Sequence, residues 1–255
     1  MKKYKNIVIT GGAGFIGSNM CDFLIEKKHN VTIIDNLSFG KKKYINSRAK
    51  FIKGDIMNKK LLVKHLTNTD AVYHFAAMSR SGPSNHEVEF CIEQNTIGTK
   101  NVLEACRINK VKKIIYAGSS TYYGNSFGKQ KETDKHDLFN PYALSKFLGE
   151  ELCLFYNNKN YVESNVLRYF NVYGDRQPTS GIYALVIGIF LDRKKKGIPL
   201  MIFGDGNQKR DFIHIDDVIK ANYKVLNTKK SGEIYNVGFG ENFSINVLAK
   251  LISKK

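Results

Sequence analysis

The chain has 255 residues, with 42% hydrophobic and 25% charged side chains, a composition typical of a globular protein that buries a sizeable core. Its 40 lysines and arginines against 23 aspartates and glutamates give a formal charge of +17. These basic residues are spread along the whole chain, which favours a solvated basic surface and excludes a compact nucleic-acid-binding element.

Nothing in the sequence predicts a metal site or a membrane segment. The apolar run Ile7–Ile9 is too short for a signal peptide, and the segment Ile182–Leu191 is interrupted by Gly188 and too short to span a bilayer. Free thiols without zinc-like spacing suit a reducing compartment, and the chain has four of them: Cys21, Cys91, Cys106 and Cys153. We therefore expect a cytoplasmic protein with no metal, nucleic-acid or membrane partner.

Short β-branched runs alternate with longer helical patterns along most of the chain. Strands are predicted at Ile7–Thr10, Val31–Ile34, Phe51–Lys53, Ala71–Phe75, Lys113–Ala117, Asn165–Tyr169 and Glu233–Val237. Helices are predicted at Phe15–Lys28, Lys59–Leu66, Val88–Ile108 and Pro141–Asn157. This alternation predicts an α/β fold, a Rossmann-type doubly wound parallel sheet.

The regular alternation of strand and helix patterns ends after Asn171. Helices are expected at Tyr183–Lys195, Asp216–Leu226 and Asn246–Ile252, with a short strand at Leu200–Phe203. We expect residues 1–171 to form a Rossmann domain. Residues 172–255 then form a small lobe, interleaved with the first domain.

A glycine-rich loop follows the first predicted strand and opens the first helix. Gly11, Gly14 and Gly17 are evenly spaced, and Gly12, Gly14 and Gly17 give the GxGxxG form. Such glycines let backbone N–H groups approach a pyrophosphate at the helix N-terminus. Phe15 and Ile16 belong to the same predicted cofactor site.

Acidic residues end the second and third predicted strands. Asp35 is positioned to accept both ribose hydroxyls of an adenosine, and its charge would repel a 2′-phosphate, so the expected cofactor is NAD rather than NADP. Asp55 follows Gly54 within reach of an adenine amino group, although a plain turn explains that residue nearly as well. Asn36 and Ile56 are grouped with the same site.

The candidate catalytic residues lie on a helix and on the strand before it. Asn140-Pro141 is typical of a helix start, and it places Tyr142 and Lys146 one turn apart on one face. A lysine ammonium one turn away can stabilise a phenolate and hold the nicotinamide ribose. The fifth predicted strand runs into the hydroxyl residues Ser119, Ser120 and Thr121.

With these motifs in order, the sequence resembles the extended short-chain dehydrogenase/reductase family, specifically its NAD-dependent sugar-nucleotide epimerases and dehydratases. The matching segments are Gly11–Gly17, Asp35, Gly54-Asp55, His74-Phe75-Ala76-Ala77, Asn95, Ser119–Gly124, Tyr142 with Lys146, Arg168-Tyr169-Phe170-Asn171, Arg210–His214 and Asn236-Val237-Gly238.

The resemblance implies that residues 1–171 form an NAD-binding Rossmann domain and residues 172–255 a small substrate-binding lobe. It also implies a role for each matched residue. Tyr142 is the expected base, Lys146 the cofactor anchor and Ser119 the hydroxyl that bridges substrate and phenol. The remaining implied cofactor residues are Phe75, Ala76, Ala77, Asn95 and Phe170. The implied substrate contacts are Ser120, Thr121, Asn171 and Arg210, with Arg80 placed in the same cleft by its position, although a surface arginine explains it equally well.

The residues after Ser119 decide the expected reaction. The family's 4,6-dehydratases have an Asp-Glu pair there and its decarboxylases a glutamate, whereas this chain has Ser120 and Thr121. The resemblance is therefore closest to the UDP-glucose and UDP-N-acetylglucosamine 4-epimerases. Those enzymes pass through a transient 4-keto sugar while hydride moves to NAD and back. A dehydratase or decarboxylase, or an NAD-binding protein with impaired catalysis, remains the alternative.

Two further expectations come from the resemblance. The helices Val88–Ile108 and Pro141–Asn157 are similar to those that pair in the family's dimers, so a homodimer is expected. Family members usually continue for several dozen residues beyond the position of Lys255, and that tail adds a diphosphate-binding arginine. We accordingly expect weak UDP-sugar binding, little discrimination against an N-acetyl group and slow epimerisation.

Overall fold

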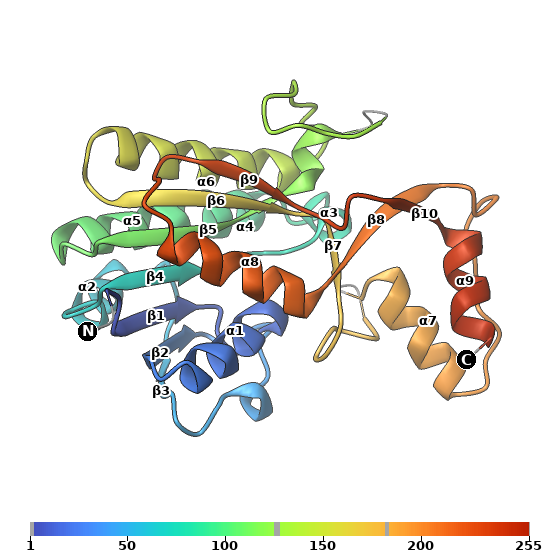
Figure 1. Ribbon diagram of the computed structural model, residues 1–255, viewed down its shortest axis with the longest axis horizontal. Helices are drawn as coiled ribbons and strands as arrows, with labels where there is room; N and C mark the ends of the chain where they lie inside the picture. The colour runs from blue at the N-terminus through green and yellow to red at the C-terminus, as the bar shows by residue number, and fades with distance from the viewer. Residues whose placement is uncertain (1–2, 125–127, 182–183, 255) are drawn as a thin grey trace.

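The computed structural model describes residues 3–124, 128–181 and 184–254. Seven parallel strands form its main sheet, in the order β3-β2-β1-β4-β5-β6-β9 (Figure 1). They are β1 (Asn6–Thr10), β2 (Asn30–Asp35), β3 (Lys50–Lys53), β4 (Ala71–His74), β5 (Lys113–Ser119), β6 (Glu163–Tyr169) and β9 (Ile234–Val237). The order reverses between β1 and β4, so the expected doubly wound sheet is confirmed.

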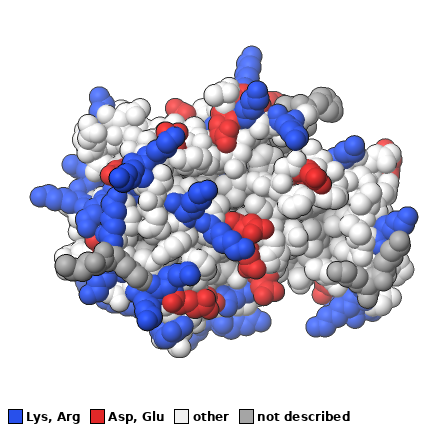
Figure 2. All heavy atoms as spheres, viewed as in Figure 1, with Lys and Arg blue, Asp and Glu red and all other residues white. Residues whose placement is uncertain are grey.

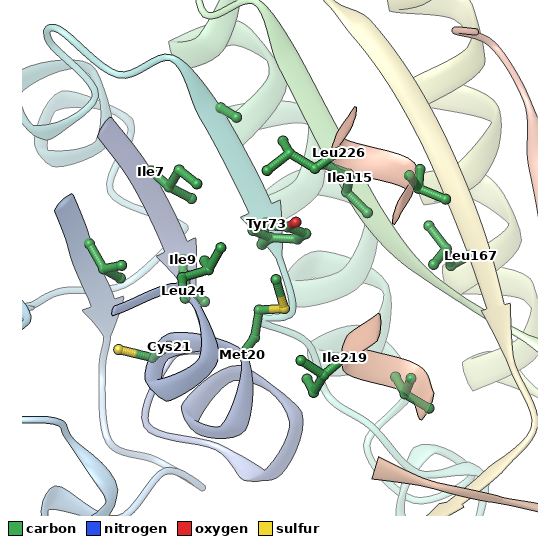
Figure 3. Packing of buried hydrophobic residues seen from close by; sticks show 14 of the residues in the cluster. Ile7, Ile9, Met20, Cys21, Leu24, Tyr73, Ile115, Leu167, Ile219 and Leu226 are labelled. Carbon is green, nitrogen blue, oxygen red and sulfur yellow. The ribbon is translucent and has the colours of Figure 1, made fainter. Parts of the chain in front are cut away.

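One face of the sheet is covered by α1 (Phe15–Glu26) and α8 (Ile215–Asn227), which lie in front of it in Figure 1. Alternate strand residues face this side because side chains along a strand point to opposite faces. Figure 3 shows how the strand and helix side chains meet in this core, with labels on Ile7, Ile9, Met20, Cys21, Leu24, Tyr73, Ile115, Leu167, Ile219 and Leu226.

The opposite face is covered by α2 (Lys59–His65), α5 (Gly98–Ile108) and α6 (Pro141–Asn158). The intervening strand residues, such as Val8, Val72 and Ile114, pack there. Because both faces are buried, the strands are apolar throughout, as the sequence predicted.

The predicted helix Val88–Ile108 contains a break in its hydrogen-bond pattern. It consists of α4 (Val88–Ile92), a π-helical turn η2 (Glu93–Ile97) and α5. A π turn inserts one extra residue and re-aims the side chains around it. Asn95 lies in this turn and is fully buried.

A small lobe extends from the carboxyl edge of the main sheet, on the right in Figure 1. It contains α7 (Val186–Lys195), α9 (Ile245–Lys254) and a second sheet of β7 (Asn171–Tyr173), β8 (Lys209–His214) and β10 (Asn242–Ser244). These strands have three to six residues and were not predicted, because such short runs carry little periodicity. Between them, α8 and β9 return to the main sheet.

The prediction of a strand at Leu200–Phe203 is wrong. The segment does alternate, with Leu200 and Ile202 packed against the core of the lobe and Met201 and Phe203 exposed. It pairs, however, with no strand among the described residues. The helix expected from Tyr183 begins at Val186, and Tyr183 itself lies outside the described residues.

The surface is basic without a single basic patch in the view drawn. Figure 2 shows lysine and arginine scattered over this face with aspartate and glutamate between them. All four cysteines are buried thiols. In the described part of the chain, no helix is both long and apolar enough to cross a membrane, and no cluster of three or more His, Cys, Asp or Glu side chains could hold a metal ion.

Candidate active site

A cavity of about 890 Å³ opens at the carboxyl edge of the main sheet. Loops from β1, β2, β4, β5 and β6 meet there because parallel strands all end at the same edge. Most predicted site residues line it, namely Gly11, Gly14, Phe15, Ile16, Gly17, Asp35, Asn36, Ile56, Phe75, Ala76, Ala77, Arg80, Ser119, Ser120, Thr121, Tyr142, Lys146, Phe170 and Asn171. Asp55, Asn95 and Arg210, although described, lie outside its lining.

The glycine motif between β1 and α1 leaves no room for a side chain at Gly11 or Gly17. Gly11 has a φ of 72°, and a Cβ there would lie 2.6 Å from the backbone nitrogen of Ala76. A Cβ on Gly17 would collide with the carbonyl oxygen of Gly11. The first turn of α1 has no acidic residue and no side-chain cap, so its N–H groups remain available to an anion. This cradle fits a dinucleotide pyrophosphate.

Asp35 is held rigidly at the end of β2. Its carboxylate accepts hydrogen bonds from the backbone N–H groups of Ala13 at 2.9 Å and Leu37 at 2.7 Å. Burial raises the pKa of Asp35, and these two hydrogen bonds oppose that shift. Each carboxylate oxygen retains a lone pair, so the group can still accept ribose hydroxyls.

Asp55 and Asn95 do not line the cavity, and their side chains form hydrogen bonds with the segments that build its walls. The Asp55 carboxylate accepts from the side-chain amide of Asn36 at 2.8 Å. The Asn95 amide donates to the Met78 carbonyl at 2.9 Å and to the Ser145 hydroxyl at 2.9 Å. Asn95 thus joins η2 to the loop after β4 through Met78 and to α6 through Ser145.

The start of α6 places the predicted catalytic phenol. Asn140 caps the helix, because its side-chain oxygen accepts from the Ala143 N–H at 2.8 Å. Tyr142 faces the cavity in the first turn. Burial raises its pKa, while a hydrogen bond with Ser119 and the charge of Arg80 oppose that shift. Both favour the phenolate, which a general base requires.

The hydroxyl residues continue directly from β5 into the 3-10 turn η3 (Ser120–Tyr123). The Ser119 hydroxyl lies 2.8 Å from that of Thr121 and accepts from the Thr121 N–H at 3.2 Å. Ser119 is thus fixed beside the phenol by its own strand end.

Lys146 is almost fully buried on α6, one turn after Tyr142. Its ammonium lies over the Tyr116 ring, with 4.0 Å between Nζ and the ring centroid. Burial lowers the pKa of Lys146 to about 7, and the nearby carboxylate of Glu150 offsets only part of this. The lysine is therefore poised to lose or gain a proton near neutral pH.

The remaining predicted substrate residues are divided in space. Arg80 lines the cavity and acts electrostatically on Tyr142. Asn171 also lines it, and its amide donates to the Asp211 carbonyl at 2.8 Å. Arg210, on β8, is exposed, and its guanidinium bonds the carbonyl of Lys209 at 2.7 Å.

Sequence reasoning missed several cationic and polar residues of the cavity. Lys41 and Lys43 come from the loop after β2, and Arg176 and Gln177 from the segment after β7. The signal for Arg176 and Gln177 was their place five and six residues beyond Asn171, where the chain must leave the sheet edge.

Because the Tyr142 phenol faces the same cavity as the glycine cradle, the fold defines an α/β enzyme whose chemistry takes place beside a bound dinucleotide. Comparison with known sequences narrows the class. The model of the NAD dependent epimerase/dehydratase family matches residues 7–238, and the chain belongs to that family.

Individual relatives agree with this assignment. A Methanocaldococcus jannaschii protein with a provisional UDP-glucose 4-epimerase name is 41% identical over 249 residues, covering 96% of this chain and 81% of its own. The UDP-N-acetyl-alpha-D-glucosaminuronate decarboxylase of Bacillus cytotoxicus is 35% identical, with 96% and 78% covered. The Thermotoga maritima UDP-glucose 4-epimerase, solved with UDP-glucose, is 35% identical with a TM-score of 0.94, covering 98% of this chain and 82% of that one.

Replacing Lys146 with Met is expected to stabilise the nucleotide-free protein at pH 6. The folded pKa of Lys146, about 7, lies below its ordinary value of 10.5, so the unfolded chain binds the proton more tightly. The folded state is therefore penalised fully below pH 7, and the penalty disappears as the pH rises toward 10.5. The expected gain at pH 6 is on the order of 2–5 kcal/mol, since one pKa unit corresponds to about 1.4 kcal/mol.

Urea unfolding at pH 6, 8 and 10 measures this effect. Lys224→Met serves as the matched control, because Lys224 is exposed on α8. A Lys146→Met protein that is less stable than wild type at pH 6 would contradict the expected burial penalty.

Proposed function

We propose that this protein is an NAD-dependent UDP-sugar 4-epimerase. One observation favours this reaction over the dehydratase and decarboxylase reactions of the family. Among the described residues that line the cavity, Asp35 is the one carboxylate. It ends β2, three strand positions from the β5 residue Ser119, or about 14 Å at usual strand spacing. No acidic side chain of the described lining stands ready beside Ser119 to eliminate water.

The chain's own residues divide the work at the sugar. The Tyr142 phenolate takes the proton of the sugar 4-hydroxyl, and the phenol so formed later returns it. The Ser119 hydroxyl forms hydrogen bonds with both the sugar oxygen and the Tyr142 oxygen. Lys146 binds the nicotinamide ribose hydroxyls and raises the share of phenolate at Tyr142. Because the same groups serve both directions, no proton is consumed overall.

The glycine cradle, Asp35 and Lys146 would hold NAD along the edge of the sheet. NAD supplies a two-electron acceptor and donor at its nicotinamide ring. The cations Lys41, Lys43, Arg80 and Arg176 offset the negative charge of two diphosphates in one cavity.

The Tyr142→Phe variant is expected to lose about 10²–10⁴-fold in turnover while it still binds NAD, since the ring keeps its packing and only the proton acceptor is removed. Purified wild type and variant are incubated with UDP-glucose, UDP-N-acetylglucosamine and their galacto epimers. Products are identified by mass and NMR, and NAD binding by calorimetry.

An isobaric 4-epimer supports the proposed reaction, whereas loss of water or of carbon dioxide from a sugar or sugar-acid substrate identifies the alternatives. Near-normal turnover by Tyr142→Phe would refute the role given to the phenol. NAD binding without any turnover of these sugars by wild type would refute the epimerase.

Cofactor choice is expected to depend on Asp35. Wild type should bind NAD at least tenfold more tightly than NADP, because a 2′-phosphate would face the Asp35 carboxylate. Asp35→Asn should narrow that ratio by removing the charge while retaining the side chain's shape. Calorimetric titration of both proteins with both cofactors measures the ratio, and equal wild-type affinities would remove this role for Asp35.

We also propose that the protein forms a homodimer through α6 and the α4–η2–α5 helix. Leu144, Leu148, Leu152 and Phe155 form a stripe on α6, and Leu144 and Phe155 are 39% and 52% exposed. A shallow groove joins this stripe to Thr96 on η2. An exposed apolar stripe on α6, beside a second helix, suits a self-complementary contact.

Sedimentation of wild type and Phe155→Glu tests the dimer. The variant should be monomeric, because a buried unpaired carboxylate disfavours the contact. Phe203→Glu, an exposed substitution in the small lobe, should remain dimeric. A monomeric wild type would overturn the proposal.

A cytoplasmic location is proposed as well, on the strength of the four buried free thiols, which persist in a reducing compartment. Cell fractionation followed by immunodetection tests it, and recovery in an extracytoplasmic fraction would contradict it.

A further inference from the structure

Two adjacent side chains at the wall of the cavity carry buried N–H donors. Arg176 and Gln177 follow β7 and line the cavity. Within the described residues, neither Nη1 of Arg176 nor Nε2 of Gln177 has a hydrogen-bond partner, although both atoms are buried. Gln177 as a whole is only 8% exposed. Buried donors are normally satisfied, so two adjacent orphans in a cavity wall point to a ligand acceptor.

The other edge of the Arg176 guanidinium is firmly anchored. Its Nη2 donates to the Asp22 carboxylate on α1 at 2.5 Å, and its Cζ lies 5.6 Å from the centroid of the Tyr44 ring. Asp22 is itself oriented by the Asn46 amide at 2.6 Å. The guanidinium therefore cannot change its orientation at the cavity wall without breaking this anchor.

The same segment is fastened to the helix that carries the glycine cradle. Asn19 on α1 donates to the Asp175 carbonyl at 3.0 Å and to the Phe15 carbonyl at 2.8 Å. The free donors therefore belong to a segment held against α1, and they share one cavity with its uncapped first turn.

We propose that Arg176 and Gln177 bind a diphosphate in this cavity, from the part of its wall that is fastened to α1. The inference rests on the proposed function, which brings two diphosphates, one in NAD and one in the UDP-sugar. A planar guanidinium with five N–H donors can serve Asp22 and a phosphate oxygen together, which a lysine cannot do in the same geometry. The Gln177 amide supplies a second, uncharged donor.

Calorimetry with NAD and, separately, with UDP identifies which diphosphate is bound. Arg176→Ala should weaken binding of that ligand by about tenfold or more, the usual effect of losing a charge-assisted hydrogen bond. Arg176→Lys should bind more tightly than Arg176→Ala but less tightly than wild type, because lysine keeps the charge and lacks the planar guanidinium with its several N–H donors. Gln177→Glu should also weaken binding, because it keeps the side chain's shape and replaces the donor with a negative oxygen.

Asp22→Asn is the control for a purely structural role. It weakens the same ion pair but leaves the Arg176 side chain in place. Binding should stay within about threefold of wild type in Asp22→Asn if Arg176 acts on the ligand. Equal losses in Asp22→Asn and Arg176→Ala would show that Arg176 merely bridges two elements, and would overturn the inference. Circular dichroism and thermal unfolding verify that every variant is folded.

The outcomes separate the two proposals. Wild type that binds neither NAD nor UDP would overturn the proposed function and this inference with it. Wild type that binds both, together with Arg176→Ala and Gln177→Glu proteins of unchanged affinity for each, would overturn this inference alone.

Discussion

The ion pair between Arg168 on β6 and Glu150 on α6 is the contact on which the catalytic end of the molecule depends. Both side chains are almost completely buried, and they meet through two hydrogen bonds of 3.1 and 2.5 Å. The guanidinium also bonds the Tyr123 hydroxyl at 2.8 Å and the Glu132 carbonyl at 3.1 Å. Removing either charge would leave the other unpaired in the interior, which costs several kcal/mol.

This ion pair fixes the position of α6 along the sheet, and the four-residue spacing on the helix then fixes where the catalytic side chains lie. Tyr142, Lys146 and Glu150 are four residues apart, so they share the face that packs on β5 and β6. With Glu150 fixed to β6, the phenol and the ammonium of the two preceding turns reach the strand ends beside Ser119. Gly149 permits the close approach, since a Cβ there would collide with the Tyr116 hydroxyl.

The charge of the cavity follows from the same geometry. The loops that converge on the sheet edge bring several cations and one carboxylate, Asp35, into its described lining, and the first turn of α1 adds its uncapped N–H groups. Such a site favours doubly charged ligands over neutral ones. Burial lowers the pKa of Lys146 to about 7, so this lysine can lose its charge near neutral pH. The arginines and the helix N-terminus keep the cavity positive when it does.

The sequence by itself determined the features that local chemistry controls. The glycine cradle, Asp35 at a strand end, the capped start of α6 and the Tyr142–Lys146 spacing were all predictable, since each depends on neighbours a few residues away or on apolar periodicity. The same reasoning gave every strand of the main sheet and most helix boundaries within two or three residues.

Only the tertiary structure decided the features whose partners are remote in the chain. The π turn that aims Asn95 at Met78, the unpaired segment at Leu200–Phe203 and the position of Arg210 outside the cavity lining depend on which surfaces meet after folding. Arg176 is the clearest case: its anchor, Asp22, lies 154 residues earlier. No local pattern encodes such a contact, because it arises only when the small lobe and α1 are brought to one edge of a parallel sheet.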